Sequence, residues 1–305
     1  MKAQGGESSP VTDTSNLTNP HADEGFLFDR ADASVVPFPE ADSRSTLEEA
    51  DHLPPIVAIG GLFTIKRYYF LYAKLLGRDP DAALSGRERF VTPLNHGVGP
   101  IEDLSAAVNN DLSEVADKLG EPIYVVGHSL GGLLGSTAIM DNPEIFAGAT
   151  FLGGAQEGIK EHTVATWGLR QLAGNPAEAE LLNYDSDFMH DHLKRVEEEW
   201  PEDIPLDLVA TSLDFVVKPP QGFGLSPKNQ EPTKRLVVPS SRLLKPVTRY
   251  LMRNMPPDVK PLYSPTVVDH INIVRSRAVL AHIDRRRRAI ARRNSQTIQT
   301  LATAN

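Results

Sequence analysis

The stretch that decides the fold reads Ile123-Tyr124-Val125-Val126-Gly127-His128-Ser129-Leu130-Gly131-Gly132. A β-branched apolar run leads directly to a serine with glycines on both sides, and residues at helical spacing follow. A serine hydroxyl becomes a useful nucleophile only when a sharp strand-to-helix turn presents it to a base, at a cost in backbone strain. We therefore predict a buried strand, a tight turn and a helix, with Ser129 at the turn.

The residues around Ser129 support this interpretation. Gly127 and Gly131 remove the side chains that would collide when the turn closes, and Gly132 lets the helix pack closely on the sheet. The apolar residues of the expected helix recur at helical spacing: Leu133, Leu134, Ala138 and Ile139.

Further β-α units lie on both sides of this turn. Strand patterns occupy residues 55–59, 89–94, 147–152 and 206–212, and helical patterns occupy residues 68–76 and 101–119. Repeated β-α units favour right-handed crossovers between parallel strands. The predicted fold class is therefore α/β, with a mostly parallel central sheet flanked by helices.

Length and composition favour one large domain with appendages. A chain of 305 residues, 40% of them hydrophobic, can fill one α/β core. We predict this domain at 53–288. A poorly ordered or edge-wrapping segment at 1–52 precedes it, and a basic, polar tail at 289–305 follows it. An insert at 155–205 is interpreted as a helical cap or lid, with an ordinary pair of packed helices as the alternative.

A second insert is predicted at 219–266. It is proline-rich and basic, and it could dock on lipid headgroups or on a partner; a packed extension of the cap with a solvated charged face is the alternative. Within it, Arg235–Val238 is expected to be the last strand of the sheet, and Val247–Met255 a helix.

The charge pattern bears on the class of partner. The formal net charge is −9, but six arginines follow the last acidic residue, so residues 1–284 carry 25 basic against 40 acidic groups. An acidic body argues against nucleic-acid binding. The arginine-rich end is interpreted as a solvated helix end with a frayed tail, and contact with anionic lipid or RNA is the alternative.

Several site types are excluded by composition. The chain has no cysteine, so disulfides, zinc-thiolate sites and cysteine nucleophiles are excluded. It has no phosphate-binding or dinucleotide-binding motif, and we expect no cofactor. His190 and His192 are two positions apart and do not share a helix face, so no metal site is predicted. Without an apolar leader or a long apolar run, we expect a cytoplasmic protein with no transmembrane segment, export not being excluded.

The Gly-His-Ser-Leu-Gly-Gly sequence at 127–132 resembles the nucleophile elbow of the α/β-hydrolase superfamily, and within it that of bacterial lipases and esterases. The resemblance implies an α/β-hydrolase fold and a catalytic triad in the chain order serine, acid, histidine. His128 is similar to the elbow histidine of those lipases, and a packing or lining role is its alternative.

The acid of the triad is sought after the strand pattern at 206–212. The sequence that follows, Leu213-Asp214-Phe215-Val216-Val217, resembles the lipase Asp-x-Val-Val-Pro region, although Lys218 stands before the prolines. The resemblance implies that Asp214 is the acid. An exposed turn aspartate is the alternative.

The base must come later in the chain, where only His270 and His282 remain. His270 belongs to a strand-like run at 267–274 that precedes the last helix, which is the context of the histidine in family members. His282 lies inside that helix, where a loop-mounted base is not expected. His270 is therefore the predicted base, and a half-buried loop histidine is the alternative.

An oxyanion hole requires two backbone N–H groups aimed at the developing charge. Leu130, directly after the serine, would supply one. The loop after the first strand would supply the other: related lipases carry His-Gly and an apolar residue there, and Gly60 stands in place of the histidine. Leu62 is the predicted second donor, with Gly61 or Phe63 as alternatives if the loop shifts.

Together these features imply a serine hydrolase that cleaves carboxylic esters, with a fatty or other apolar acyl chain, through an acyl-enzyme. An acyltransferase, thioesterase or amidase with the same triad is the alternative, followed by a non-catalytic interaction module. The expected partner is a small-molecule or lipid ester. Peripheral contact with a lipid surface is left open, and the oligomeric state is not predicted.

Overall fold

The computed structural model describes residues 35–37, 53–62, 89–93, 97, 99–158, 186–214, 216–240 and 245–304. All of them belong to one compact unit, Ser34–Asn305. The strands are β1 (Val35–Pro37), β2 (Ile56–Ile59), β3 (Arg89–Val91), β4 (Ile123–His128), β5 (Phe146–Leu152), β6 (Leu206–Thr211), β7 (Thr233–Pro239) and β8 (Lys260–Ser264). The α-helices are α3 (Ile101–Leu119), α4 (Leu130–Asp141), α7 (Asp187–Glu199), α8 (Lys245–Arg253) and α9 (Arg277–Ala304).

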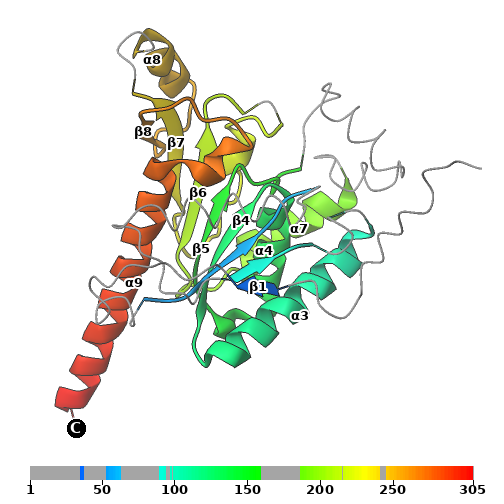
Figure 1. Ribbon diagram of the computed structural model, residues 1–305, viewed down its shortest axis with the longest axis vertical. Coiled ribbons are helices and arrows are strands. Elements are labelled where there is room, and N and C mark those ends of the chain that lie inside the picture. Colours follow the sequence, from blue (N-terminus) through cyan, green and yellow to red (C-terminus); the bar gives the residue numbers. More distant parts are fainter. Residues whose placement is uncertain are drawn as a thin grey trace, which may run out of the picture. The chain divides into compact units, whose positions relative to one another are not determined.

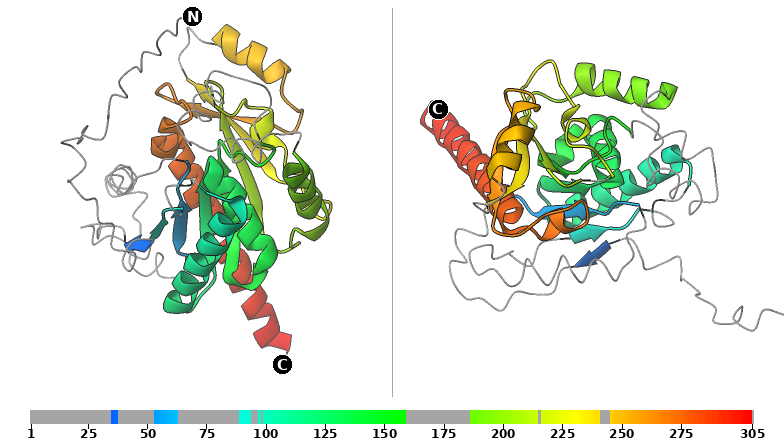
Figure 2. Two further views of the ribbon diagram at one scale, coloured as in Figure 1. Left: turned by 90° about the vertical axis from the view of Figure 1, so that its right-hand side faces the viewer. Right: turned by 90° about the horizontal axis from the view of Figure 1, so that it is seen from above.

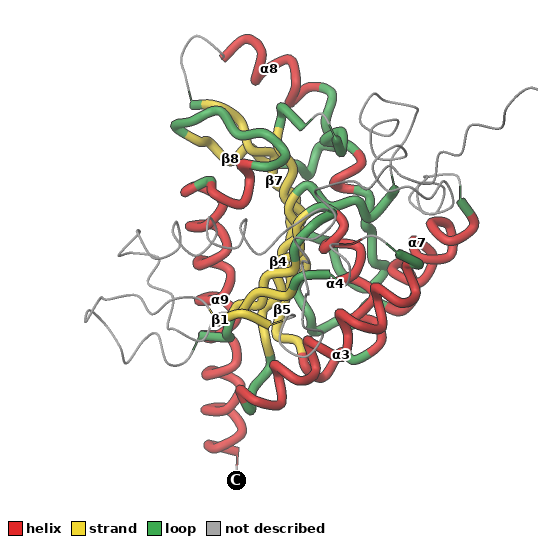
Figure 3. The backbone as a smooth tube through the Cα atoms, turned by 45° about the vertical axis from the view of Figure 1, so that its right-hand side comes forward, coloured by secondary structure: helices red, strands yellow, loops and turns green. Residues whose placement is uncertain are grey.

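The strands form one sheet in the order β1-β3-β2-β4-β5-β6-β7-β8. Every pair from β3 to β8 is parallel, and only β1 runs antiparallel, against β3 at the edge. The predicted mostly parallel sheet is therefore confirmed. Its parallel strands bring their carboxyl ends to the same end of the sheet, and the sheet lies between α4 and α9 (Figures 1 and 3).

The two faces of the sheet bury alternate residues of each strand, as the period of a β-strand requires. Val57 and Ile59 of β2 belong to the core shared with α3, α4 and α7. Ile56 and Ala58 belong to the core on the opposite face, which α9 covers. Figures 1 and 2 show these two helical layers on opposite sides of the strands. Because both faces are covered, the strands read as continuous apolar runs.

The helix predicted at 101–119 is confirmed as α3. Its buried residues recur every three or four positions and face the sheet: Ile101, Leu104, Val108, Leu112, Val115 and Ala116. Gly120 ends the helix with a φ of 69°, and its N–H donates to the carbonyl of Ala116 at 2.8 Å. A positive φ at this position is accessible to glycine without steric cost.

The stretch 219–266 differs from the predicted insert. It contributes two sheet strands, β7 and β8, with α8 between them. The strand expected at Arg235–Val238 lies within β7, but it is not the last strand, because β8 pairs beyond it. The strand-like run expected at 267–274 is also wrong: 272–275 form a short 3-10 helix, and β8 ends earlier, at Ser264.

Three further predictions concern the ends of the chain and the lid. Within 155–205, α7 packs on α4 and buries Met189, and residues 159–185 lie outside the described residues. The helix expected at 68–76 also lies outside them. Of the segment 1–52, β1 adds an edge strand. At the other end of the chain, α9 runs past the expected boundary at 288 and continues to Ala304, so the predicted tail is helical.

A buried carboxylate attaches α9 to the sheet. Asp207, at the amino end of β6, is fully buried, and its Oδ2 lies 3.1 Å from His282 Nε2 and 2.8 Å from Arg286 Nε. Nearby, burial and the charge of Asp207 raise the pKa of Tyr124, whose hydroxyl shares a 2.7 Å hydrogen bond with Thr150. These contacts join the last helix to the strands beneath it.

We expect Asp207→Asn to lower the free energy of unfolding by about 3 kcal/mol, because removing the carboxylate charge leaves the Arg286 guanidinium without its ionic partner. Equilibrium denaturation in urea measures the change. Glu114→Gln is the matched control: its i,i+4 pair with Lys118 is exposed, and its loss should cost about 0.4 kcal/mol. Equal, small losses in both variants would contradict an anchoring role for Asp207.

Candidate active site

Ser129 occupies a strained turn between β4 and α4. Its φ is 54° and its ψ is −121°, and it is the one non-glycine residue of the described part with a positive φ. Such a conformation costs on the order of 1–3 kcal/mol and persists only where the surroundings enforce it. The predicted strand, turn and helix are therefore present, with Ser129 at the tip of the turn.

Two glycines make this turn sterically possible. A Cβ atom added at Gly127 would lie 2.5 Å from the carbonyl oxygen of Gly131. One added at Gly131 would lie 2.4 Å from the carbonyl oxygen of Ile59 in β2. Both contacts involve backbone atoms, which cannot turn aside, so any larger residue would force the turn open.

Backbone hydrogen bonds fix the turn to the neighbouring strand. The Ser129 N–H donates to the carbonyl of Leu152 at 3.1 Å. The Ser129 carbonyl accepts from the N–H groups of Gly132 at 2.9 Å and Ala155 at 3.2 Å. The main chain of the serine is thus tied to the carboxyl end of β5 and to the loop that follows it.

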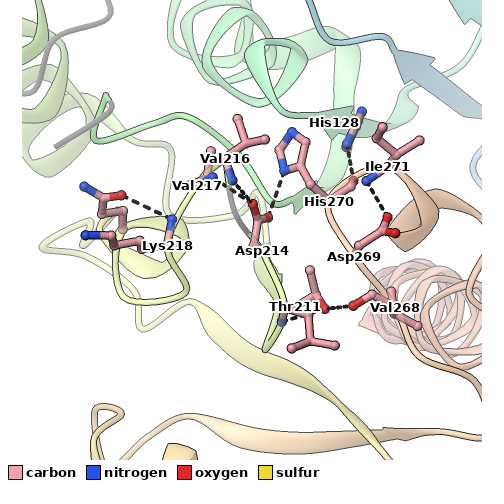
Figure 4. Close-up of polar contacts among 12 residues, drawn as sticks. His128, Thr211, Asp214, Val216, Val217, Lys218, Val268, Asp269, His270 and Ile271 are labelled. Atoms are coloured by element: carbon pink, nitrogen blue, oxygen red, sulfur yellow. Dashed lines mark hydrogen bonds and ion pairs between the residues drawn. The ribbon is translucent and has the colours of Figure 1, made fainter. Parts of the chain in front are cut away.

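Asp214 and His270 form a buried pair beyond the ends of β6 and β8. The distance from His270 Nδ1 to Asp214 Oδ2 is 2.8 Å, and both side chains are almost fully buried. The other carboxylate oxygen, Oδ1, accepts the N–H groups of Val216 at 2.9 Å and Val217 at 2.7 Å (Figure 4). Every contact of this carboxylate is an acceptor contact, as suits an ionised acid.

This pairing defines the tautomer of His270. A carboxylate can only accept, so Nδ1 of the neutral imidazole carries the hydrogen, and the lone pair lies on Nε2. An imidazole held in this way can take a proton on Nε2 while the carboxylate stabilises the resulting cation.

The loop that carries His270 is attached to β6 and the residues after it. The Thr211 hydroxyl donates to the carbonyl of Val268, and Leu213 forms an isolated parallel bridge with Asp269. The Asp269 carboxylate accepts the N–H of Ile271 at 3.0 Å, as Figure 4 shows, and that of Asn272 at 2.7 Å. These two bonds hold the turn after the histidine.

His128 links the serine turn to the histidine loop. Its Nε2 lies 2.8 Å from the carbonyl oxygen of His270, and because that oxygen can only accept, Nε2 carries the hydrogen. The two imidazole rings are 4.9 Å apart between centroids. Burial, and secondarily the charge on His270, lowers the pKa of His128 from 6.5 to about 3. Sequence analysis left a lining role open for this residue, but not this hydrogen bond.

Gly153 lies between the serine turn and the aspartate–histidine pair. It follows Leu152, which binds the Ser129 N–H, and its φ is 50°. A Cβ atom added there would lie 3.0 Å from Asp214 Oδ2 and 3.1 Å from His270 Nδ1. Nothing in the sequence around Gly153 distinguishes it from an ordinary turn glycine.

The two residues predicted as oxyanion donors lie close together. Leu130 is the first residue of α4, so its N–H has no acceptor inside the helix. A Cβ atom added at Gly97 would lie 2.8 Å from Leu130 Cδ2 and 3.4 Å from Leu62 Cα. One added at Gly61 would lie 2.9 Å from Ser129 Cβ. The Gly61–Leu62 turn therefore passes directly over the serine side chain, and Phe63 lies outside the described residues.

Gln156 is a residue that sequence analysis missed. It is 1% exposed, and among the described residues neither polar atom of its side chain has a hydrogen-bond partner. A Cβ atom added at Gly132, in the first turn of α4, would lie 2.6 Å from its Nε2. A buried carboxamide without partners is costly, and only the folded arrangement brings this one beside the elbow.

The histidines outside this pair have other surroundings. Within the described ranges, no three His, Cys, Asp or Glu side chains are grouped so that they could hold a metal ion. His192 instead lies 3.1 Å from the Ser136 hydroxyl, and burial lowers its pKa to about 4. His282, the alternative base, lies beside Asp207 at the opposite end of β6 from Asp214.

No helix in the described part is long and apolar enough to cross a bilayer.

Comparison with known proteins identifies the fold. Residues 56–298 match the family described as the alpha/beta hydrolase family. No curated protein matches the sequence. The predicted fold class, an α/β-hydrolase fold, is thereby confirmed.

Solved structures of this fold resemble the chain at low sequence identity. Aspergillus fumigatus lipase B is 12% identical with a TM-score of 0.52, covering 79% of this chain and 52% of the fungal one. The mature Bacillus licheniformis lipase BlEst2 is 14% identical with a TM-score of 0.47, covering 79% and 92%. The thioesterase domain from the curacin biosynthetic pathway is 12% identical with a TM-score of 0.42, covering 78% and 92%. At 12% identity, the likeness to the fungal lipase concerns the fold alone.

The depressed pKa of His128 predicts a pH-dependent stability. Between pH 6.5 and about 3 the unfolded chain binds a proton at this residue and the folded chain does not, so the free energy of unfolding falls as the pH is lowered. His128→Gln should reduce this loss between pH 7 and pH 4 by about 3 kcal/mol, measured by urea denaturation at each pH. His190→Gln, at an exposed position of α7, is the control. An unchanged pH profile in His128→Gln would show that His128 takes up its proton equally in both states.

Proposed function

Since this chain belongs to the alpha/beta hydrolase family, we propose that it is a serine ester hydrolase acting through Ser129, His270 and Asp214. The observation that carries the proposal is the buried His270–Asp214 hydrogen bond at 2.8 Å, on a loop bound directly to the strained serine turn through His128. A serine in strained backbone and an imidazole paired with a carboxylate are the groups that acyl transfer to serine requires, and His128 joins their two segments.

In the first half of the proposed reaction, the Ser129 Oγ attacks the ester carbonyl carbon, and its proton passes to His270 Nε2. Asp214 keeps the imidazole oriented and stabilises the cation through Nδ1–H. The tetrahedral intermediate collapses as the alcohol leaves with the proton that His270 returns. The serine is then esterified by the acyl group.

In the second half, water takes the place of the alcohol. His270 removes a proton from the water, the hydroxide attacks the acyl carbon, and Ser129 leaves with the proton from His270. The chain is restored and a carboxylic acid is released.

We propose that the N–H groups of Leu130 and Leu62 stabilise the oxyanion in both halves. The close approach of the Gly61–Leu62 turn to the Ser129 Cβ supports this assignment. Each well-aimed donor of this kind contributes about 3 kcal/mol to the transition state. Gly61 remains the alternative second donor, since it belongs to the same turn.

The proposed substrate class is a carboxylic ester with an apolar acyl chain. The elbow sequence supports it by its likeness to bacterial lipases, and a fungal lipase shares the fold at a TM-score above one half. The same triad could instead transfer the acyl group to an alcohol or amine, or cleave a thioester or amide. The acceptor that takes the acyl group from Ser129 distinguishes the transferase, and the leaving group of the first half distinguishes the thioesterase and the amidase.

Labelling with a fluorophosphonate probe tests the nucleophile. The intact chain should be labelled and should hydrolyse p-nitrophenyl esters, and Ser129→Ala should lose the label and lower kcat by about 10⁴-fold or more. His270→Ala should lose turnover, whereas His282→Ala should keep it. Graded esters from acetate to laurate would define the acyl preference.

The outcomes of this assay separate the candidate functions. A label that persists in Ser129→Ala would overturn the nucleophile. Labelling without ester turnover would favour the transferase, thioesterase or amidase activity, and an unlabelled intact chain would favour an interaction module.

Gly153→Ala tests whether the pair itself must keep its geometry. The added methyl group would press on Asp214 Oδ2 and His270 Nδ1, so kcat should fall by about 10²-fold. Gly120→Ala is the matched control, because its φ of 69° imposes the same backbone strain while no atom lies within 4 Å of the added Cβ. It should lose about 1 kcal/mol of stability and keep kcat. Equal kcat in both variants would mean that the pair is not part of the reaction.

A further inference from the structure

The exposed apolar side chains are concentrated in one part of the chain. Among the described residues, every large hydrophobic side chain classed as exposed lies between 247 and 271, and each is between 51% and 68% exposed: Val247, Tyr250, Tyr263, Val267 and Ile271. We call these five side chains the apolar patch. Scattered exposed apolar residues are ordinary, but their confinement to one segment is not.

Two members of the apolar patch lie on the outer side of α8. Thr248 is buried and Met252 packs against the core shared with α3 and α4, so these residues mark the inner side of the helix. Val247 and Tyr250 are exposed, and so are Arg249 and Arg253. A helix whose solvent side mixes aromatic and aliphatic residues with arginines is typical of elements that lie at a lipid interface.

Tyr263, a third member of the apolar patch, lies on β8. It pairs with Val238 of β7, and paired residues on parallel strands project from the same face of a sheet. Val238 belongs to the same core as Met252 of α8, so Tyr263 projects from the sheet face on which α8 packs. It is exposed because β8 is the last strand of the sheet.

The remaining members adjoin the candidate active site. Val267 lies three residues before His270, and Ile271 follows it directly. Both are more than half exposed, although His270 itself is buried. Two members of the apolar patch therefore lie on the loop that holds the proposed base, and Figure 4 shows Ile271 next to His270.

The charge of this region is opposite to that of the rest of the chain. Residues 245–277 contain six basic and two acidic side chains, whereas the remaining residues contain 25 basic and 38 acidic. Both acids have partners: Asp258 pairs with Lys234 at 2.9 Å, and Asp269 accepts two backbone N–H groups. Four of the basic residues are exposed, namely Arg249, Arg253, Lys260 and Arg277.

We infer that the apolar patch and these basic residues dock the protein on an anionic lipid surface. Tyrosine and aliphatic side chains would enter the headgroup boundary, and the basic side chains would pair with lipid phosphates or carboxylates. The net negative charge of the remaining residues would disfavour docking through most other surfaces, and the arginines of α9 are tested separately by the control below. Docking brings the His270 loop to the membrane and goes beyond the proposed ester hydrolysis, which it does not require.

Vesicle co-sedimentation tests the inference without substrate turnover if the full chain carries Ser129→Ala. We expect binding to phosphatidylcholine vesicles that contain about one quarter phosphatidylserine, and weak binding to phosphatidylcholine alone or at high salt. Val247→Ser with Tyr250→Ser, and separately Arg249→Glu with Arg253→Glu, should each lower the partition coefficient about tenfold or more.

The matched control reverses two exposed arginines of α9, Arg285→Glu with Arg292→Glu, which makes the same charge change outside this region. It should retain most vesicle binding. Thermal unfolding confirms that every variant folds, and hydrolysis of dissolved p-nitrophenyl butyrate by the patch variants with Ser129 restored reports the proposed activity separately.

Two outcomes would overturn the docking surface. Either the chain fails to bind the anionic vesicles, or the α9 reversal removes binding that the patch variants keep. A change of oligomeric state in Val247→Ser with Tyr250→Ser, measured by light scattering, together with unchanged vesicle binding would assign the face to a second copy of the chain instead.

Discussion

The left-handed backbone at Ser129 is the constraint on which the rest of the site depends. The conformation is unfavourable for a serine, so the surrounding structure must enforce it. Gly127 and Gly131 leave the space, and the bonds to Leu152 and Ala155 hold the main chain in it. These contacts come from β2, β4, β5 and α4, so the central sheet has to be assembled before the hydroxyl is presented. A substitution that loosens the packing of the central sheet should therefore also disturb the position of the Ser129 hydroxyl.

The elbow, the central strands and α3 could be predicted from the sequence because their signals are local. Apolar runs, helical spacing and flanking glycines all act within a few neighbouring residues, and they agree with one another there. Chain order and a family resemblance predict Asp214 as the acid and His270 as the base. Their hydrogen bond joins positions that are 56 residues apart and is visible only in the structure.

The missed features depend on distant contacts. Gly153 resembles any turn glycine until Asp214 and His270 pack on it, and the His128 bond crosses 142 residues. The sequence of 219–266 predicts an insert and not two sheet strands, because its prolines and charges are atypical of strands. At the edge of the sheet, however, β8 can accommodate Pro261 and exposed side chains. At 267–274, the apolar β-branched residues suggest a strand, but the Asp269 side chain binds the backbone ahead of it and forms a turn.

Strand β6 contacts the segment around His270 on both sides of the histidine. At its amino end Asp207 secures α9, and at its carboxyl end Thr211 and Leu213 secure the loop before the histidine. The segment that carries His270 is thus attached to β6 both before and after the histidine. The position of the imidazole therefore depends little on the path of the chain through β7, α8 and β8. Changes in the length of the turns between β7, α8 and β8 should therefore be tolerated. A slip of one residue in β6, in contrast, would displace both of these attachments at once and leave only the His128 bond from β4.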